Sequence, residues 1–258
     1  MSHERPGGKE WDAETYHRVS MPQVTWGKAV LERLSKIGLR GDETIVDAGC
    51  GTGRLTAELL DRWPRARVIA IDASHNMIEA AARHLDRFGD RVSFRCADVI
   101  FSTATFHWIK DHQTLFANLH RSLRFGGWLC AQCGGGPNLA LQHARADALL
   151  HSEPFRPFFS DWADPWEFAS AEIAQGRLTD AGFVQVETDV EEAPVVLPDA
   201  PAFRAYMTTV ILRPHLAQLP DELRARFVGD MTDLAARDEP PFRIDYWRLN
   251  LLGQRAAP

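Results

Sequence analysis

Short apolar runs and amphipathic segments alternate along the first half of the chain. Apolar residues at helical spacing predict a leading helix from Pro22 to Ile37, which ends before Gly38. Five strands and three more helices are predicted to follow in alternation. The strands are expected at 44–47, 67–72, 92–97, 99–104 and 128–133, and the helices at 55–63, 74–88 and 111–123. This order predicts an α/β fold with a doubly wound, mostly parallel sheet.

The second half departs from this alternation. After Gly134 the chain is rich in glycine, proline and aromatic residues, which predicts a cap rather than further sheet. Strand patterns return at 183–190 and 242–252, with helices predicted near 202–212 and 221–236. We expect a single domain over 1–258. Its parts would be covering N-terminal helices (10–38), a cofactor-binding core (39–137), a cap insertion (138–176) and C-terminal strands (177–258) with inserted helices (198–238).

Composition narrows the classes of partner. The 258 residues are 45% hydrophobic and carry a formal charge of -6, so no broad basic surface is expected to attract nucleic acid or an anionic membrane. No apolar run approaches the roughly 20 residues of a membrane span, and the first residues lack the apolar stretch of a secretion signal. We therefore expect a cytoplasmic protein that acts on a small molecule.

The four cysteines do not suggest a metal site. Cys130 and Cys133 form a C-x-x-C pair, but residues three apart in a strand point to opposite faces of the sheet. No second pair supports zinc binding, so no metal is predicted.

The most informative motif follows the first predicted strand, where Asp47-Ala48-Gly49-Cys50-Gly51-Thr52-Gly53 runs into a helix. Such a loop brings backbone N–H groups and a helix N-terminus to the carboxyl edge of the sheet, which suits a polar cofactor. Asp72 ends the next strand, 19 residues after Gly53, where a carboxylate can accept hydrogen bonds from ribose hydroxyls. Position 54 is Arg rather than the third glycine of a dinucleotide motif, which disfavours NAD.

Five motifs in order carry a family resemblance, namely VDAGCGTG, VIAIDASHNMIEAA, VSFRCAD, FSTATFHWI and LRFGGWL. They resemble class I S-adenosylmethionine (SAM)-dependent methyltransferases, and most closely the branch with trans-aconitate and juvenile hormone acid methyltransferases. The resemblance spans about Tyr16 to Cys133 and implies a Rossmann-like sheet of seven strands whose last strand is reversed. It also implies roles for particular residues in SAM binding. Gly49, Gly51 and Gly53 would flank the methionine part with Asp47 and Cys50 in the same loop, Asp72 would hold the ribose, Ala73 and Met77 would line the adenine, and Asp98 would meet the adenine amino group.

One junction departs from that family. Its members place about 15 residues between the acidic residue after the third strand and the start of the fourth strand, whereas here Asp98 runs directly into Val99. Neighbouring parallel strands need a crossover of a dozen or more residues. We therefore expect either an omitted loop or a true deletion on the adenine side, and Asp98 either contacts adenine or opens the fourth strand.

The acceptor is expected to be a small carboxylic acid. An ionised carboxylate needs no general base, and amide or indole N–H groups can orient its oxygens. The leader Tyr16-x6-Gln23-x2-Trp26 resembles that of carboxylate-methylating relatives, so Gln23 and Trp108 would orient the acid while Tyr16 and Trp26 form pocket walls. Gln23 can also be read as a solvent-exposed helix residue and Trp108 as a core aromatic residue.

Two rival functions stay open. His107 beside Trp108 is a candidate general base for a hydroxyl, amine or carbon acceptor. A catalytically silent SAM-binding protein is the third possibility, favoured only by a true deletion after Asp98. Aromatic residues and arginines of the cap can form an apolar pocket with a cationic end, although most are more simply packing residues and solvated charges. They are Phe158, Phe159, Trp162, Arg156, Arg204 and Arg213.

Overall fold

The computed structural model describes residues 12–13, 15–16, 20–72, 74–91 and 97–256. Their main sheet has six strands in the order β2-β1-β3-β4-β8-β5. The first four of these run parallel, and β8 runs antiparallel to both of its neighbours, as the predicted reversed final strand requires. The strands are β1 (Thr44–Ala48), β2 (Arg67–Ile71), β3 (Ala97–Thr103), β4 (Leu123–Gly134), β5 (Phe183–Glu192) and β8 (Trp247–Arg255).

Helices cover both faces of this sheet because its side chains alternate between the two faces. On one face Ile45, Val68 and Phe101 pack against three helices, and on the other Ile100 and Leu129 pack against two. The first group is α2 (Met21–Lys36), α3 (Arg54–Arg62) and α4 (His75–Leu85), and the second is α5 (His112–Ser122) and α7 (Ala171–Asp180). Cys130 and Cys133 lie in the cores of opposite faces, as their spacing in a strand predicts.

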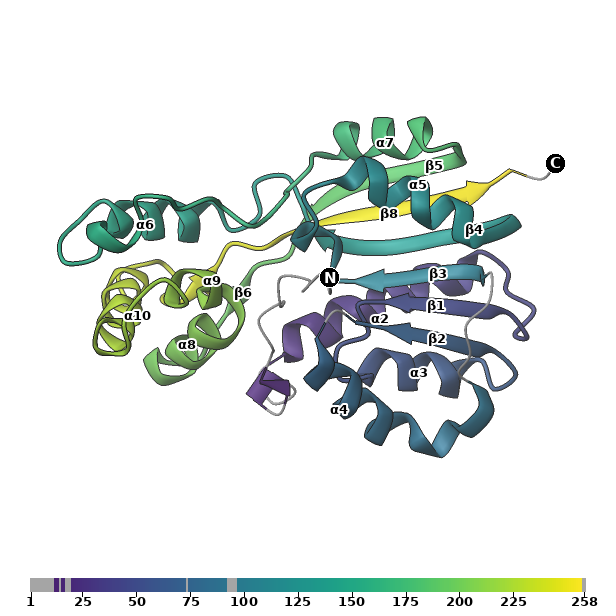
Figure 1. Cartoon of the computed structure of the whole chain (residues 1–258), viewed down its shortest axis with the longest axis horizontal. Helices are drawn as coiled ribbons and strands as arrows, with labels where there is room; N and C mark the ends of the chain where they lie inside the picture. The colour runs from purple at the N-terminus through teal and green to yellow at the C-terminus, as the bar shows by residue number, and fades with distance from the viewer. Residues whose placement is uncertain (1–11, 14, 17–19, 73, 92–96, 257–258) are drawn as a thin grey trace, which may run out of the picture.

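A helical lobe with a hydrophobic core of its own stands beyond the carboxyl ends of the parallel strands (Figure 1). Buried rings of Phe155, Phe203 and Phe227 fill this core. The lobe contains α6 (Ala140–Leu150), α8 (Ala200–Tyr206), a π-helical turn (Met207–Ile211), α9 (Arg213–Leu216) and α10 (Asp221–Ala235). A short ribbon of β6 (Val195–Val196) and β7 (Arg243–Ile244) completes it, and η3 (Arg156–Phe158) lies in the same part of the chain.

The part of the lobe that lies between β4 and α7 ends before position 176, the boundary expected from the sequence. The expected boundary at 176 falls inside α7, whose Ala174 and Leu178 belong to the core of the sheet. Two contacts tie this end of the lobe to the loop after β3: Lys110 Nζ donates to the Trp166 carbonyl at 2.6 Å, and the Glu167 N–H donates to the His107 carbonyl at 2.8 Å.

The predicted strand at 92–97 falls almost entirely on residues outside the described ranges, so a seventh strand stays a prediction. The helical turn η1 (Asp86–Arg91) follows α4 and ends the described range before this segment. Among the described residues, no helix is long and apolar enough to cross a bilayer.

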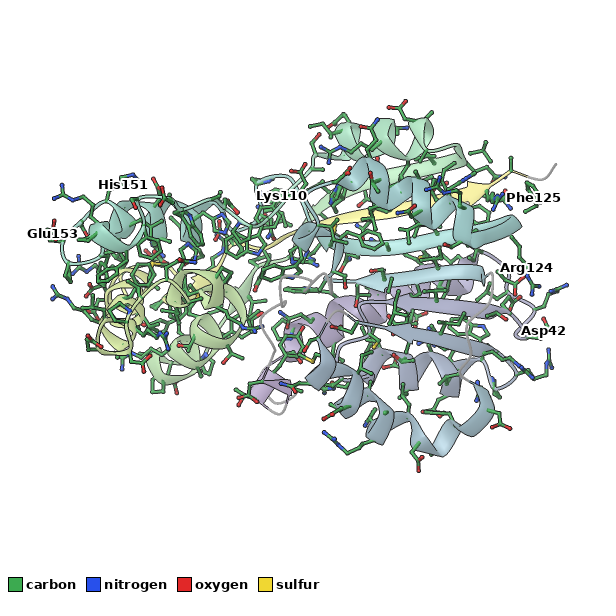
Figure 2. The ribbon with its side chains drawn as sticks, in the orientation of Figure 1. Asp42, Lys110, Arg124, Phe125, His151 and Glu153 are labelled. Carbon is green, nitrogen blue, oxygen red and sulfur yellow. The ribbon has the colours of Figure 1, made fainter. Side chains whose placement is uncertain are left out.

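Asp98 does not reach the cofactor edge of the sheet, which corrects its expected role at adenine. It lies near the start of β3, where its Oδ2 accepts the Thr44 N–H at 2.7 Å and its Oδ1 accepts from Arg124 at 3.2 Å. Figure 2 shows Arg124 at the end of the sheet far from Lys110 and the lobe. Residues 97–103 form one continuous strand, so Asp98 opens the strand, as the alternative interpretation of this junction held.

Asp98→Ala should therefore lower stability without weakening cofactor binding. Losing the hydrogen bond to the Thr44 amide should lower the free energy of unfolding by about 1–3 kcal/mol. Denaturant titration measures that change, and calorimetry with S-adenosylhomocysteine should give a dissociation constant within about twofold of the wild type. Arg124→Gln, which removes only the more exposed ion pair, should cost less than about 1 kcal/mol. A tenfold or greater loss of affinity in Asp98→Ala would restore the adenine role.

Candidate active site

The glycine loop between β1 and α3 lies across the end of β2. The N–H groups of Gly49 and Cys50 both donate to the Ile71 carbonyl, at 2.8 and 2.9 Å. Gly49 has φ +86°, and a methyl group there would lie 1.8 Å from Thr105 Oγ1. Gly51 has φ +54°, but nothing lies within 4 Å of where its side chain would begin. The loop therefore packs tightly at Gly49 and leaves an open cradle at Gly51.

Asp72 follows β2 and faces this cradle. Its Oδ2 accepts the Gly51 N–H and its Oδ1 accepts the Ser74 N–H, each at 2.9 Å. A carboxylate oxygen can accept two hydrogen bonds, so each oxygen keeps one acceptor site. That is the arrangement required to bind two adjacent hydroxyl groups.

A cavity of about 1010 Å³ opens in front of Asp72, and we call it the cofactor cavity. The buried side chain of Met77 and the exposed side chain of Ile71 provide apolar walls on the β2 side, while Leu115 and Leu119 of α5 line it as well. Apolar walls beside a hydroxyl-binding carboxylate fit a nucleoside. Ala73, the other predicted adenine contact, lies outside the described residues.

A second, smaller cavity of about 50 Å³, the loop cavity, lies between α2 and the glycine loop and is lined by Asp47 and Cys50. Asp47 is buried, and its Oδ2 accepts from Thr56 Oγ1 at 2.5 Å. Burial raises the pKa of Asp47 to about 7, against the lowering effect of that hydrogen bond, and nearby Asp72 raises it further. A buried carboxylate is a suitable partner for an ammonium group.

Gly53 and Cys50 have structural explanations. Gly53 caps α3 with φ +79°, and a side chain there would press on Leu85 and Ala81 of α4 at 3.2–3.4 Å. Burial raises the pKa of the Cys50 thiol, which keeps it neutral. Gly53 lines neither the cofactor cavity nor the loop cavity, so its contact with a cofactor stays a prediction.

A third cavity, again about 50 Å³, lies on the lobe side of the glycine loop, and we call it the arginine cavity. Its polar lining comes from Gln23, His107, Asn138, Tyr246 and Arg248, and Trp26 and Trp108 supply aromatic walls. Tyr16 and Ala104 line all three cavities, and Trp108 lines both the arginine cavity and the cofactor cavity. The predicted residues Tyr16, Gln23, Trp26, His107 and Trp108 thus come together at one junction.

The backbone at this junction is strained. Ala104, directly after β3, has φ +54°, and Leu139 in the wall of the arginine cavity has φ +59°. Non-glycine residues rarely hold such angles, which cluster at functional sites. A hydrogen bond from the Ala104 N–H to the Gln132 carbonyl at 2.8 Å fixes the first of them.

Gln23 is buried and takes part in a chain of hydrogen bonds. Its Nε2 donates to the Tyr206 hydroxyl at 2.8 Å, and that hydroxyl lies 3.0 Å from the Tyr246 hydroxyl. Among the described residues, Gln23 Oε1 has no hydrogen-bond partner. Gln23 is therefore a buried pocket residue, not an exposed residue of the first helical turn.

His107 is fixed in one neutral form. The Gly134 N–H donates to its Nδ1 at 3.2 Å, and burial lowers its pKa well below the usual value, helped by Arg248 and His112. A neutral imidazole with Nδ1 as acceptor carries its hydrogen on Nε2. The ring can therefore donate from Nε2, whereas the lone pair on Nδ1 already accepts the Gly134 N–H.

Four polar residues of this site escaped the sequence analysis: Asn138, Tyr206, Tyr246 and Arg248. The first three lie in the lobe or in the segments that connect it to the sheet, where no spaced motif marks them, and Arg248 lies in β8. Arg248 alone left a signal, because it is a charged residue within the apolar strand pattern Trp247–Leu252.

The predicted cap residues divide into two groups. Trp162 and Arg213 line the cofactor cavity from the lobe side. The other four serve the lobe itself: Phe159 is buried in its core, Phe158 and Arg204 are exposed, and Arg156 pairs with Glu153 at the surface.

Comparison with known proteins decides the family. Residues 46–131 match the family described as "Methyltransferase domain". The chain is 30% identical over 251 residues to trans-aconitate 2-methyltransferase of Mycobacterium sp. (strain KMS), which covers 91% of this chain and 93% of that protein. It belongs to the class I SAM-dependent methyltransferases.

Other relatives of this methyltransferase agree with that assignment. Trans-aconitate 2-methyltransferase of Mycobacterium tuberculosis (strain ATCC 25177 / H37Ra) is 33% identical over 156 residues, which is 58% of each chain. Among solved structures, phosphoethanolamine N-methyltransferase 2 of Haemonchus contortus in complex with SAM has a TM-score of 0.58 at 18% identity, over 95% of this chain and 56% of that one. The cyclopropane synthase MmaA2 of M. tuberculosis has a TM-score of 0.56 at 18% identity, over 90% and 84%. These two structures share the fold.

SAM is the cofactor of this methyltransferase, and the residues present fit it. SAM combines a nucleoside with an amino acid, and the site offers a carboxylate with two spare acceptor positions, apolar walls and the open cradle at Gly51. Asp47 lies under the same loop, where a carboxylate suits the ammonium group of the amino-acid part.

The raised pKa of Asp47 predicts a pH-dependent stability of the methyltransferase without SAM. The native carboxyl keeps its proton up to about pH 7, whereas the unfolded chain releases it near the ordinary value of 3.8. The native state therefore binds more protons between these values, and stability falls as the pH rises through that window.

Asp47→Asn, which still offers an oxygen to Thr56, should remove this dependence. The variant should match the wild type near pH 4 and exceed it by about 2–4 kcal/mol at pH 8, as measured by urea unfolding at each pH. Parallel stability curves for the two proteins across pH 4–8 would contradict the shift.

Proposed function

We propose that this methyltransferase transfers the methyl group of SAM to a carboxylate oxygen of a small acid, in line and without a general base. One observation carries the proposal. The junction between the cofactor cavity and the arginine cavity presents neutral donors, and the imidazole there already uses its acceptor nitrogen. Such a site can orient an anion, and the described residues that line both cavities, Tyr16, Ala104 and Trp108, include no side chain that accepts a proton at neutral pH.

The cofactor would lie along the glycine loop. Asp72 would bind the two ribose hydroxyls through its spare acceptor positions, and Met77 and Ile71 would contact the adenine ring. Gly49 and Gly51 would flank the amino-acid part, with Asp47 near its ammonium group. Bound SAM supplies a methyl group activated on a sulfonium centre, so the chain itself has only to bind, orient and exclude water.

Gln23 and Trp108 would hold the reacting carboxylate. The Gln23 amide, which lines the arginine cavity, can rotate by half a turn, so that its oxygen accepts from the Tyr206 hydroxyl and its NH₂ takes the place of the unpartnered Oε1. Trp108 lines both cavities, and its indole N–H is a donor without acceptor capacity. Neutral donors fix the carboxylate oxygens and leave a lone pair for attack on the methyl group.

The helical lobe would act as the cap over this reaction. Trp162 and Arg213 face the cofactor cavity from the lobe, and the contacts of Lys110 and Glu167 join the lobe to the loop that carries Trp108. A small acid is also the substrate class in the names of the trans-aconitate 2-methyltransferases to which this chain is similar.

The rival function, with His107 as general base, requires a free basic nitrogen. Nδ1 is occupied by the Gly134 amide, and Nε2 carries the hydrogen in this tautomer. A base role would require that hydrogen bond to break and the ring to change tautomer. This arrangement supports the base-free acid reaction over the alternatives with a hydroxyl, amine or carbon acceptor.

A panel assay with His107→Asn tests both mechanisms. The purified enzyme is incubated with SAM and small carboxylic acids, alcohols and amines, and mass spectrometry detects the gain of one methyl group. We expect methyl esters of acids only. An asparagine can accept the Gly134 N–H but cannot act as a base, so activity of His107→Asn should stay within about tenfold of the wild type, with an unchanged pH profile.

Three results would contradict the proposal. Loss of about 100-fold or more in His107→Asn, with intact binding of S-adenosylhomocysteine, would establish the general base. Methylation of an amine or alcohol but of no acid would exclude the carboxylate acceptor, and no product at all despite SAM binding would favour a catalytically silent protein.

A further inference from the structure

Arg248 is a buried cation on the strand that closes the arginine cavity. It lies in β8 with 2% of its surface exposed, and its register partner on β4 is Gly134, the residue that fixes His107. Its guanidinium stacks over the Trp26 ring, with the central carbon 4.5 Å from the ring centroid. Burial lowers the pKa of Arg248, but an arginine remains charged at neutral pH.

Two of its donor groups are unused. Among the described residues, Arg248 Nε and Nη2 have no hydrogen-bond partner, although both are buried. The carboxylate nearest in the sheet register, Glu191 on β5, is bound by Arg33 and Asn250 instead. Other arginines of this region are paired, for example Arg243 with Glu192.

An unpaired buried charge is costly, so a protein that keeps one generally pairs it with a ligand. The aromatic and phenolic neighbours of Arg248, namely Trp26, Tyr16, Tyr206 and Tyr246, stabilise a cation only in part. Burial of the phenols raises the pKa of Tyr206 to about 12, so these groups are neutral at neutral pH. The site therefore has a net positive charge, and the arginine that carries the two unpartnered donors lines the arginine cavity.

The size of the arginine cavity limits what can bind there. About 50 Å³ holds roughly four waters, or one carboxylate group, and is too small for a whole polycarboxylic acid. Tyr16, Ala104 and Trp108 separate this cavity from the cofactor cavity and line both. A ligand anchored at Arg248 would extend from there past Trp108 toward the cofactor.

We propose that Arg248 binds a second, non-reacting anionic group of the methyl acceptor, so that the enzyme selects acids with at least two carboxylates. This inference rests on the proposed function and adds its specificity determinant. A guanidinium that held both oxygens of the reacting group would withdraw the lone pairs that attack the methyl group. The anion at Arg248 is therefore the distal one, while Gln23 and Trp108 hold the reacting carboxylate.

Binding measurements separate this inference from the reaction itself. Wild-type enzyme, Arg248→Met, Arg248→Lys and the control Arg243→Gln are saturated with S-adenosylhomocysteine and titrated by calorimetry with tricarballylate, glutarate or butyrate. Arg243→Gln removes a surface arginine of the adjacent ribbon β7, paired with Glu192, and leaves the cavity intact. Steady-state kinetics with the corresponding acids gives KM and kcat separately.

We expect Arg248→Met to weaken binding of the acids with two or three carboxylates by about 30-fold or more, because a buried charge pair is lost. Butyrate should bind all four proteins equally weakly. Arg248→Lys should bind the larger acids with intermediate affinity, and Arg243→Gln should behave as the wild type.

Kinetics and stability give two further readouts of Arg248→Met. For an acid that is methylated, the KM of this variant should rise more than its kcat falls. The melting temperature of ligand-free Arg248→Met should equal or exceed that of the wild type, because an uncompensated charge is gone.

Three outcomes would overturn the inference. One is unchanged binding of tricarballylate to Arg248→Met, another is an equal loss for butyrate and tricarballylate, and the third is no binding of tricarballylate or glutarate to the wild type. If Arg248→Met does not fold, Arg248→Lys gives the same comparison. Methylation of monocarboxylates with no effect of Arg248 would leave the proposed function standing and remove only the second anionic site.

Discussion

The close approach of Gly49 to Thr105 is the constraint on which the site depends. The strand order places β1 beside both β2 and β3, and the loop after β1 turns toward β2. Here the loop after β1 touches the loop after β3 and leaves no space for a methyl group. A side chain on Gly49 would lie 1.8 Å from Thr105 Oγ1. The contact brings Ala104 beside the glycine loop, where it lines all three cavities, and Trp108 lines two of them. Ligand sites at the carboxyl edge of open α/β sheets occur where the strand order reverses in this way.

Acidic and basic side chains lie on opposite sides of the contact between Gly49 and Thr105. Asp47 and Asp72 lie on the side of the glycine loop, where a cationic cofactor with a ribose and an ammonium group fits. Arg248 lies on the other side, buried and without a carboxylate partner in the described part of the chain. Between them Gln23, His107 and Trp108 are neutral donors. In the proposed reaction an anionic acceptor would approach an activated methyl group here, and orientation rather than acid–base chemistry would supply the rate.

Sequence patterns predicted the parts of this structure that local rules govern. The strands β1 and β2, the helix α2 and the tight turn at Gly49 and Gly51 follow from periodicity and from backbone angles that only glycine adopts readily. The helices near 202–212 and 221–236 were also predicted, but the contacts of Tyr206 and Tyr246 in the site were not, because such contacts join residues nearly 200 positions apart, as in the hydrogen bond from Gln23 to Tyr206. Asp98 was ambiguous for the same reason: its partner Thr44 lies 54 residues away, at the end of the sheet opposite the glycine loop.

A crystal structure with S-adenosylhomocysteine and tricarballylate tests the central claim most directly. The account predicts that the ribose binds Asp72, that one carboxylate lies within hydrogen-bond distance of Arg248 Nε and Nη2, and that a second carboxylate at Gln23 and Trp108 faces the sulfur. An acid bound outside the arginine cavity, or Arg248 paired with a carboxylate of the protein itself, would contradict it.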